Sequence, residues 1–181
     1  LAGLAYSARI ICGTETSVER YPTIVQVDMQ GIFSGTWSQG CGANIITNLH
    51  VVSAAHCFAG WTYLGPQYRR IRAGSSLRNT GGVIVYIVSE HNHPSYGTLG
   101  YDGDVSVVRL ATPLTFSPVI QAIPIPSQGS QLTDNVPVVH AGWGTTIAGV
   151  SASVSPVLLE TTIYTVNNQL CANRYASLNN P

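Results

Sequence analysis

Short apolar runs, separated by turn-forming residues, dominate the hydrophobic pattern of the chain. Strands are predicted where such runs lie between Gly, Pro, Asn and Ser, at Thr23–Val27, Ala43–Ile46, Val83–Val88, Val105–Leu110 and Val136–Ala141. Helical periodicity is rare, and residues 167–175 are the best candidate for one short helix. The pattern therefore predicts an all-β fold, either a barrel or a sandwich.

The stretch Thr112–Pro126 is rich in proline and reads as an extended crossing between two sub-domains. No apolar run reaches the roughly 18–20 residues that span a bilayer. The first residues, Leu1–Ser7, are apolar and small, which is typical of the tail of a secretory signal. An arbitrary chain end explains them equally.

Composition narrows the classes of partner. The 181 residues are 45% hydrophobic and 9% charged, with a net charge of zero, which argues against a nucleic-acid backbone or an acidic membrane as partner. All eight basic residues are arginine, which would suit an alkaline medium, although compositional drift explains this equally well. The four cysteines indicate an oxidising compartment more than a zinc site, because none has Cys-x-x-Cys spacing.

The first candidate for chemistry is the stretch Val51–Cys57, where a β-branched and small-residue run ends at His56 and Cys57. Cys41 precedes it, and a bond between Cys41 and Cys57 would close a loop worth about 3 kcal/mol. That bond explains the cysteines without explaining the adjacent histidine. A buried structural histidine is the ordinary interpretation of such a residue taken alone.

The second candidate is Asp104, which stands where the acidic turn Tyr101–Asp104 enters an apolar strand. A carboxylate entering a core needs a hydrogen-bond partner, and an imidazole N–H is a suitable one. The carboxylate would fix the tautomer of such a ring and stabilise its protonated form. Asp102 is interpreted as a plain turn residue.

Four motifs occur in order along the chain: Arg9-Ile10-Ile11-Cys12-Gly13, Ser53-Ala54-Ala55-His56-Cys57, Asp102-Gly103-Asp104-Val105 and Ala141-Gly142-Trp143-Gly144. In this order they resemble the activation site, the histidine box, the aspartate box and the Gly-Trp-Gly turn of the trypsin/chymotrypsin family of serine proteases. Three further segments are most similar to the digestive trypsins of insects: Arg20-Tyr21-Pro22, His93-Pro94-Ser95-Tyr96 and Asn168-Gln169-Leu170-Cys171. The resemblance covers nearly all of residues 9–181.

The resemblance implies two six-stranded antiparallel Greek-key barrels. We expect residues 1–9 to be a signal remnant or activation peptide, residues 10–114 to form a complete first barrel that carries His56 and Asp104, and residues 115–181 to hold a linker and an incomplete second barrel. The Cys41–Cys57 disulfide would brace the histidine. The chain is expected to be C-terminally truncated, and its half-barrel to leave strand edges and apolar surface open.

The family's mechanism gives the histidine and the aspartate fixed roles. His56 would act as general base and then general acid, and Asp104 would orient it. The nucleophilic serine lies in a Gly-Asp-Ser-Gly-Gly sequence in this family, and the 181 residues contain no such sequence. We therefore expect this chain alone to be inactive. Cleavage between Arg9 and Ile10 would be the activating step.

Several further residues follow from the same resemblance. Tyr101 and Tyr175 would line substrate subsites; the alternative for both is a packing role. The loop Ser75–Val83 lacks the glutamates of the family's calcium site, so no metal is expected, and His91 and His93 are interpreted as a solvated loop. Cys12 replaces a usual glycine, and Cys171 lacks its usual partner. Three alternatives are open: the two cysteines are free, they pair with each other, or Cys12 is a sequence error and the partner of Cys171 is lost by truncation.

The implied function is a secreted, digestive serine endopeptidase of the gut lumen that cleaves after Arg or Lys. Its partners would be protein or peptide substrates, proteinaceous inhibitors and an activating protease; neither nucleic acid, membrane nor cofactor is expected, and the protein would be a monomer. The alternative is a non-catalytic homologue that acts by binding. A purely structural, disulfide-stapled β domain would leave the motifs as coincidence.

Overall fold

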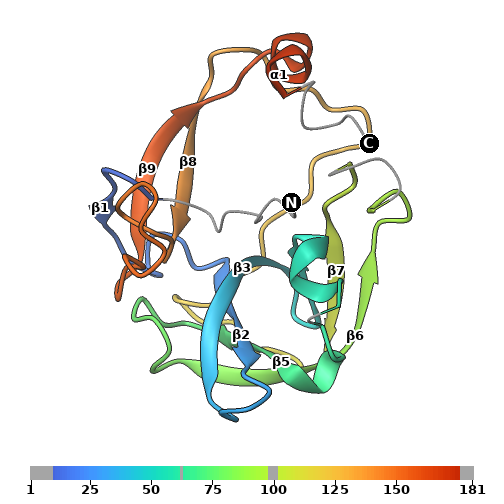
Figure 1. The fold of residues 1–181 in the computed structure, drawn as a ribbon, viewed down its shortest axis with the longest axis vertical. Coiled ribbons are helices and arrows are strands. Elements are labelled where there is room, and N and C mark those ends of the chain that lie inside the picture. Colours follow the sequence, from blue (N-terminus) through green and yellow to red (C-terminus); the bar gives the residue numbers. More distant parts are fainter. Residues whose placement is uncertain (1–9, 62, 98–101, 176–181) are drawn as a thin grey trace.

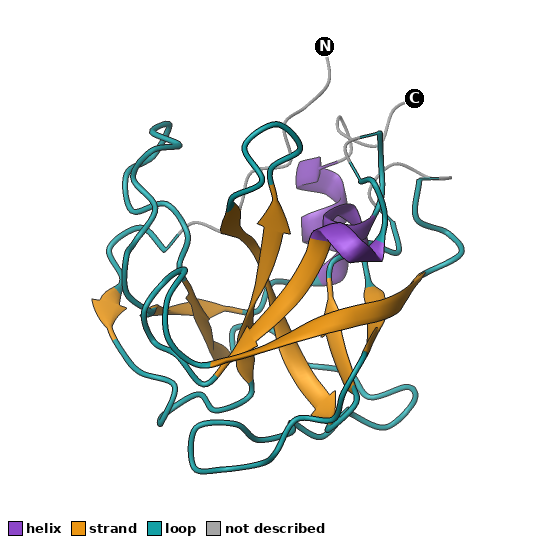
Figure 2. Ribbon diagram, turned by 90° about the horizontal axis from the view of Figure 1, so that it is seen from below, coloured by secondary structure: helices purple, strands orange, loops and turns teal. Residues whose placement is uncertain are grey.

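The computed structural model describes residues 10–61, 63–97 and 102–175, without the side chain of Tyr175. Six antiparallel strands form a closed barrel in the order β2-β3-β4-β7-β6-β5 (Figures 1 and 2). They are β2 (Ile24–Gln30), β3 (Trp37–Thr47), β4 (His50–Ser53), β5 (Arg69–Ala73), β6 (Val83–Asn92) and β7 (Ser106–Leu110). The complete first barrel expected from the sequence is confirmed.

Successive side chains of a strand point to opposite faces, and in a barrel one of these faces is the interior. In β7, for example, Ser106, Val108 and Leu110 are buried, while Val107 and Arg109 point outward. The inward-facing residues of all six strands form one apolar core. Its buried members include Val25, Val27, Ile45, Val51, Ile71, Val85, Ile87, Val108 and Leu110.

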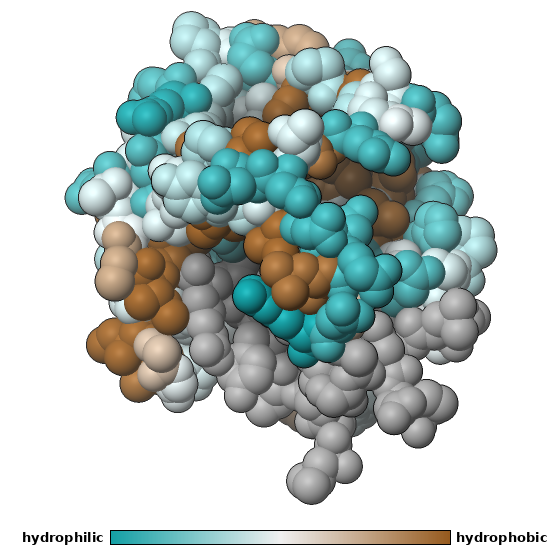
Figure 3. All heavy atoms as spheres, turned by 90° about the horizontal axis from the view of Figure 1, so that it is seen from above, coloured by the Kyte–Doolittle hydropathy of each residue, from teal (hydrophilic) through white to brown (hydrophobic). Residues whose placement is uncertain are grey.

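The second unit is a three-stranded sheet in the order β1-β9-β8, so the second barrel is partial, as expected. It consists of β1 (Thr14–Glu15), β8 (Pro137–Gly142) and β9 (Leu159–Tyr164), and is followed by the helix α1 (Asn168–Tyr175). Seen from the α1 end, hydrophobic surface lies among hydrophilic residues (Figure 3). Val139 in β8 and Ile163 in β9 are both about half exposed.

Residues 74–82 form the loop between β5 and β6, and this loop makes hydrogen bonds both to the barrel and to the second unit. The side chain of Gln26 in β2 donates to a loop carbonyl at 2.9 Å and accepts from a loop N–H at 2.9 Å. From the other side, the carbonyl of Ser76 accepts hydrogen bonds from Trp143 Nε1 and from the N–H of Leu158, both at 2.8 Å. These bonds fix how the two units face each other.

Strand β5 was not predicted, because arginine fills three of its five positions. Arg70 and Arg72 point outward, and both guanidinium groups contact Asp28 Oδ2, at 3.1 and 2.9 Å. Asp28 is buried. The buried carboxylate compensates the charges that make this strand look solvent-exposed in the sequence.

The remaining predicted elements are present with shifted ends. The helix predicted at 167–175 is α1, and the strand predicted at Val83–Val88 is longer, because β6 continues to Asn92. The predicted loop at His91 is therefore wrong: His91 pairs with Val107 as part of the sheet, with its side chain exposed. Within the described ranges, no helix has the length and apolar character needed to cross a membrane.

Candidate active site

His56 lies in a short 3₁₀ helix, Ala55–Phe58 (η1), directly after β4. Its helix neighbours Ala55, Cys57 and Phe58 are buried in the barrel wall. Because three of the four side chains point inward, the fourth is turned outward, and the imidazole of His56 is 38% exposed. The buried-histidine interpretation is therefore wrong.

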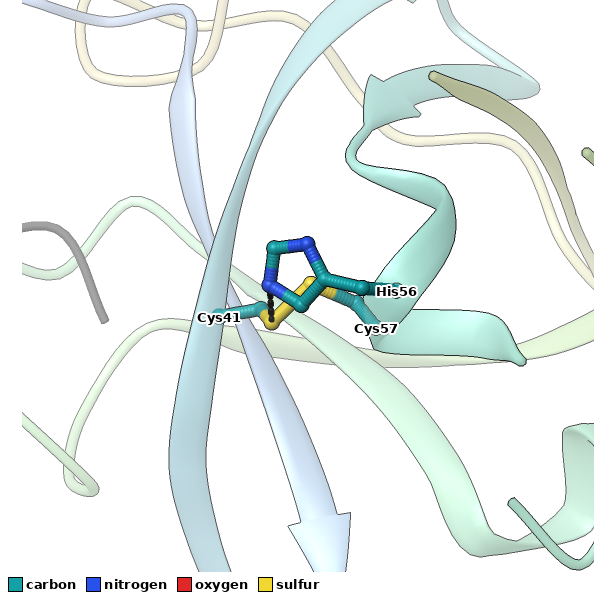
Figure 4. Close-up of side chains that lie close together, drawn as sticks. All are labelled: Cys41, His56 and Cys57. Atoms are coloured by element: carbon teal, nitrogen blue, oxygen red, sulfur yellow. Dashed lines mark hydrogen bonds between the residues drawn. A yellow bond between two sulfur atoms is a disulfide. The ribbon is translucent and has the colours of Figure 1, made fainter. Parts of the chain in front are cut away.

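The Cys41–Cys57 disulfide joins strand β3 to η1 across 16 residues of chain. The ring of His56 lies beside this bond, with Nε2 4.0 Å from Cys41 Sγ (Figure 4). The bond therefore holds the backbone of the residue next to His56 and also forms part of the surface below its ring.

Removing this disulfide is expected to destabilise the protein. A bond that closes a loop of this size contributes about 3 kcal/mol to the free energy of unfolding. The double variant Cys41→Ala/Cys57→Ala should lose roughly that amount, measured by denaturant unfolding under non-reducing conditions. Cys12→Ala, which removes an exposed free thiol, is the control and should change the free energy of unfolding by less than about 1 kcal/mol. A double variant as stable as the parent would contradict the expectation.

Asp104 stands in a tight turn just before β7. The N–H of Val105 donates to the carbonyl of Gly103 at 2.6 Å, which makes Asp104 the central residue of a three-residue turn. Its carboxylate accepts two hydrogen bonds from His56: Oδ2 from the ring Nδ1 at 2.8 Å, and Oδ1 from the backbone N–H at 2.9 Å.

These two hydrogen bonds determine the form of the imidazole. An ionised carboxylate only accepts hydrogen bonds, so Nδ1 of His56 carries the proton and faces Asp104. In the neutral ring, Nε2 then keeps its lone pair and can accept a proton. Among the described residues, no hydroxyl group donates to Nε2. The arrangement is that of an oriented base without a bonded proton donor.

A cleft of about 450 Å³ lies at His56 and Asp104. One wall consists of β3 residues 39–44 and β4–η1 residues 52–54, and the other of residues 140–144 from the end of β8 onward. The cleft is therefore formed between the barrel and the second sheet, as the bonds of the 74–82 loop require. An extended peptide would find both apolar wall and backbone groups here.

His140 lines the same cleft and was missed in the sequence. It is the one polar side chain in the otherwise apolar run Val136–Ala141, just before the Gly-Trp-Gly turn. That contrast was the available signal. Periodicity alone could not show which face of β8 points toward the barrel.

The side chains of Cys41, His56 and Cys57 are the only group of three possible metal ligands in the described part of the chain, with ligand atoms within 4.8 Å of one another. The two sulfur atoms are joined in the disulfide and cannot act as thiolates. A single imidazole is left, which does not make a metal site. The absence of metal stays a prediction from the sequence.

The other predicted site residues are distributed as follows. Arg9 and Tyr101 lie outside the described residues, as does the side chain of Tyr175. Ile10 is fully buried, and its N–H donates to the carbonyl of Thr145 at 3.0 Å.

The two remaining cysteines, Cys12 and Cys171, are free and exposed, so the alternative that they pair with each other is wrong. Cys12 has φ +59°, in the left-handed region that favours glycine. That conformation agrees with the glycine that the family resemblance leads one to expect at this position.

Comparison with known proteins gives a consistent result. The family model described as Trypsin matches residues 10–180. Alkaline trypsin C of Manduca sexta is 34% identical over 178 residues, which is 94% of this chain and 64% of that protein. Achelase-1 of Lonomia achelous is 34% identical, over 93% of this chain and 76% of that protein.

The chain thus spans about 64% of the length of alkaline trypsin C. Among solved structures, an inactivated protease paralogue of the scabies mite superposes with a TM-score of 0.82 at 24% identity, over 93% of this chain and 68% of that one. At this identity, the structural likeness concerns the fold alone.

Proposed function

The chain belongs to the trypsin family of serine proteases, and we propose that it supplies the histidine and aspartate of a secreted serine endopeptidase. The observation that carries the proposal is the double contact of Asp104 with His56, at 2.8 Å to Nδ1 and 2.9 Å to the backbone N–H. It leaves Nε2 as a base beside the cleft of about 450 Å³.

In the family's mechanism, a serine hydroxyl attacks the carbonyl carbon of the scissile peptide bond. His56 Nε2 takes the hydroxyl proton as the serine oxygen bonds to that carbon. The same proton is then given to the leaving amine as the peptide C–N bond breaks, which leaves an acyl-enzyme. Water, deprotonated by His56, then attacks the acyl carbon. The ester bond to the serine breaks, the proton passes from His56 to the serine oxygen, and the acid is released. Asp104 stabilises the imidazolium in both halves of the reaction and does not itself become protonated.

The serine of this reaction would come from polypeptide C-terminal to Pro181. The 181 residues contain no Gly-Asp-Ser-Gly-Gly sequence, and the backbone N–H groups of the oxyanion hole surround that serine in the family. On this proposal, the present chain holds the proton-transfer half of the catalytic apparatus and cannot hydrolyse peptides by itself.

The cleavage preference and the place of action of the protein are proposed from its relatives. Several insect relatives are named trypsins, among them the alkaline trypsins A and C of Manduca sexta, which supports cleavage after Arg or Lys and a digestive role in a gut lumen. The exclusive use of arginine as basic residue is compatible with an alkaline medium. Protein substrates, proteinaceous inhibitors and an activating protease would be the partners of such an enzyme.

Synthesis as a zymogen, cut after Arg9, is part of the same proposal. Ile10 would become the new amino terminus. Its side chain is already buried near the second sheet, and its backbone nitrogen lies 3.0 Å from the carbonyl oxygen of Thr145. The burial of the side chain and the hydrogen bond of the backbone both support a role for Ile10 at the second sheet rather than in solvent.

The test begins with the coding sequence downstream of the Pro181 codon, followed by expression of the full-length protein and activation after Arg9. Hydrolysis of an arginyl amide, with little hydrolysis of a phenylalanyl amide, is expected. Glycine in place of the serine, together with no hydrolysis of either amide, would overturn the proposal and favour the non-catalytic homologue. The matched pair of amides separates the proposed specificity from the activity itself.

A further inference from the structure

A second turn packs directly against the turn that carries Asp104. It begins at His93, just after the last residue of β6. The N–H of His93 donates to the carbonyl of Val105 at 2.9 Å, which extends the β6–β7 pairing by one bond. The carbonyl of His93 accepts from the N–H of Tyr96 at 3.0 Å and closes the turn. The backbones of the two turns are therefore held together.

The side chain of His93 is fixed within this turn by Ser95. Its Nδ1 accepts a hydrogen bond from the backbone N–H of Ser95 at 3.2 Å and lies 2.8 Å from Ser95 Oγ. A backbone N–H can only donate, so Nδ1 is the unprotonated nitrogen of the ring. The ring thus has a defined tautomer and a defined orientation although it is exposed.

Gly103 packs against the side chains of His93 and Ser95. A Cβ atom at Gly103 would overlap Ser95 Oγ and come within 2.7 Å of His93 Nδ1. Gly103 also has φ +67°, which other residues adopt at a cost. The surface formed by His93 and Ser95 therefore limits how far Gly103 can move, and the next residue in the chain is Asp104.

We propose that His93 is a positioning residue for Asp104: with Ser95 it supports Gly103, and so holds the carboxylate where it meets both donors of His56. The two contacts of Asp104 have to be made at once, and a shift of the turn that keeps one would lengthen the other. This inference rests on the proposed function only where it concerns catalysis. The positioning itself concerns a hydrogen bond that exists without substrate.

The test compares four variants of the full-length protein. His93→Asn keeps an acceptor oxygen at the place of Nδ1, because both atoms are bonded to Cγ, whereas His93→Gln places its oxygen one bond farther out and His93→Ala has none. His91→Ala is the control, since His91 is an exposed histidine two residues earlier, within β6. All four are first compared by thermal unfolding.

The decisive readout is the ¹H NMR resonance of the proton on His56 Nδ1, assigned by its disappearance in His56→Ala. A proton in a short hydrogen bond to a carboxylate resonates at low field. The resonance should keep its wild-type position in the His93→Asn and His91→Ala variants, and move upfield or disappear in the Ala and Gln variants at position 93. A wild-type resonance in folded His93→Ala, or in folded His93→Gln if the alanine variant does not fold, would overturn the proposal.

Activity provides a second, separate readout. If the full-length protein is a protease, His93→Ala should lower kcat about tenfold or more with KM nearly unchanged, because a small misplacement of a catalytic group affects the chemical step. His93→Asn should restore kcat to within about threefold of wild type, and failure of that rescue would count against the proposal. If the wild-type protein is inactive, the proposed function fails, while the NMR comparison still decides the positioning role.

Discussion

Replacing His56 with alanine in the full-length protein is expected to reduce kcat for an arginyl amide about 10⁴- to 10⁶-fold, the range found when the histidine of such a triad is removed. The ring is the base that accepts the proton of the nucleophile. Little change in stability is expected, because the side chain is 38% exposed while its three neighbours in η1 provide the buried contacts. Amide hydrolysis and thermal unfolding measure the two effects.

His50→Ala is a matched control for this variant. His50 is the first residue of β4, the strand that leads to His56. Its Nδ1 forms a hydrogen bond with the hydroxyl of Thr47 at 3.0 Å, and not with Asp104. Its removal should leave kcat within about threefold of wild type, as expected for a histidine outside the reaction path. Full activity in the His56→Ala variant would show that the roles are wrongly assigned.

Asp104→Asn is expected to lower kcat about 10⁴-fold, the size known for this change in the family. The carboxylate accepts two hydrogen bonds from His56, at Nδ1 and at the backbone N–H. An amide has only one acceptor oxygen, so its NH₂ group must face one of the two donors. If that donor is Nδ1, the imidazole changes to the tautomer with its proton on Nε2, where it can no longer act as a base.

Asp102→Asn provides the control for the charge alone. Asp102 is an exposed turn residue two positions earlier. Its change to asparagine also removes one negative charge from the same turn, but kcat should stay within about threefold, as for a surface charge screened by solvent. Equal losses in the two variants would indicate that Asp104 acts through the net charge of the turn and not through its contact with His56.

The histidine and the aspartate could be proposed from the sequence because each is marked by its immediate neighbours. His56 follows a buried strand and precedes a cysteine, and Asp104 enters a strand from an acidic turn. Both signals are local. That the two side chains meet depends on β4 pairing with β7, which brings Ser53 opposite Ser106 across more than fifty residues. Only the family resemblance could predict that contact.

Strand β5 and the contacts of His93 could not be predicted for different physical reasons. Two of the three arginines of β5, Arg70 and Arg72, form ion pairs with Asp28, which lies more than forty residues earlier in sequence, so hydrophobicity alone misjudges that strand. His93 has an ordinary turn sequence around it. Its place against Gly103 follows from where β6 ends relative to β7, and strand ends are the least certain part of a sequence-based assignment.

The proposed specificity for arginine would make the protein a potential substrate of its own activity. Peptide substrates commonly bind by adding an extended strand, which requires free backbone groups. Arg69, Arg70, Arg72 and Arg109 lie in strands whose two edges are already paired. Under the proposed specificity, cleavage at these four arginines has to wait until the barrel strands open, whereas Arg20 and Arg174 are exposed outside the barrel. Closure of the barrel therefore protects only the arginines within its strands.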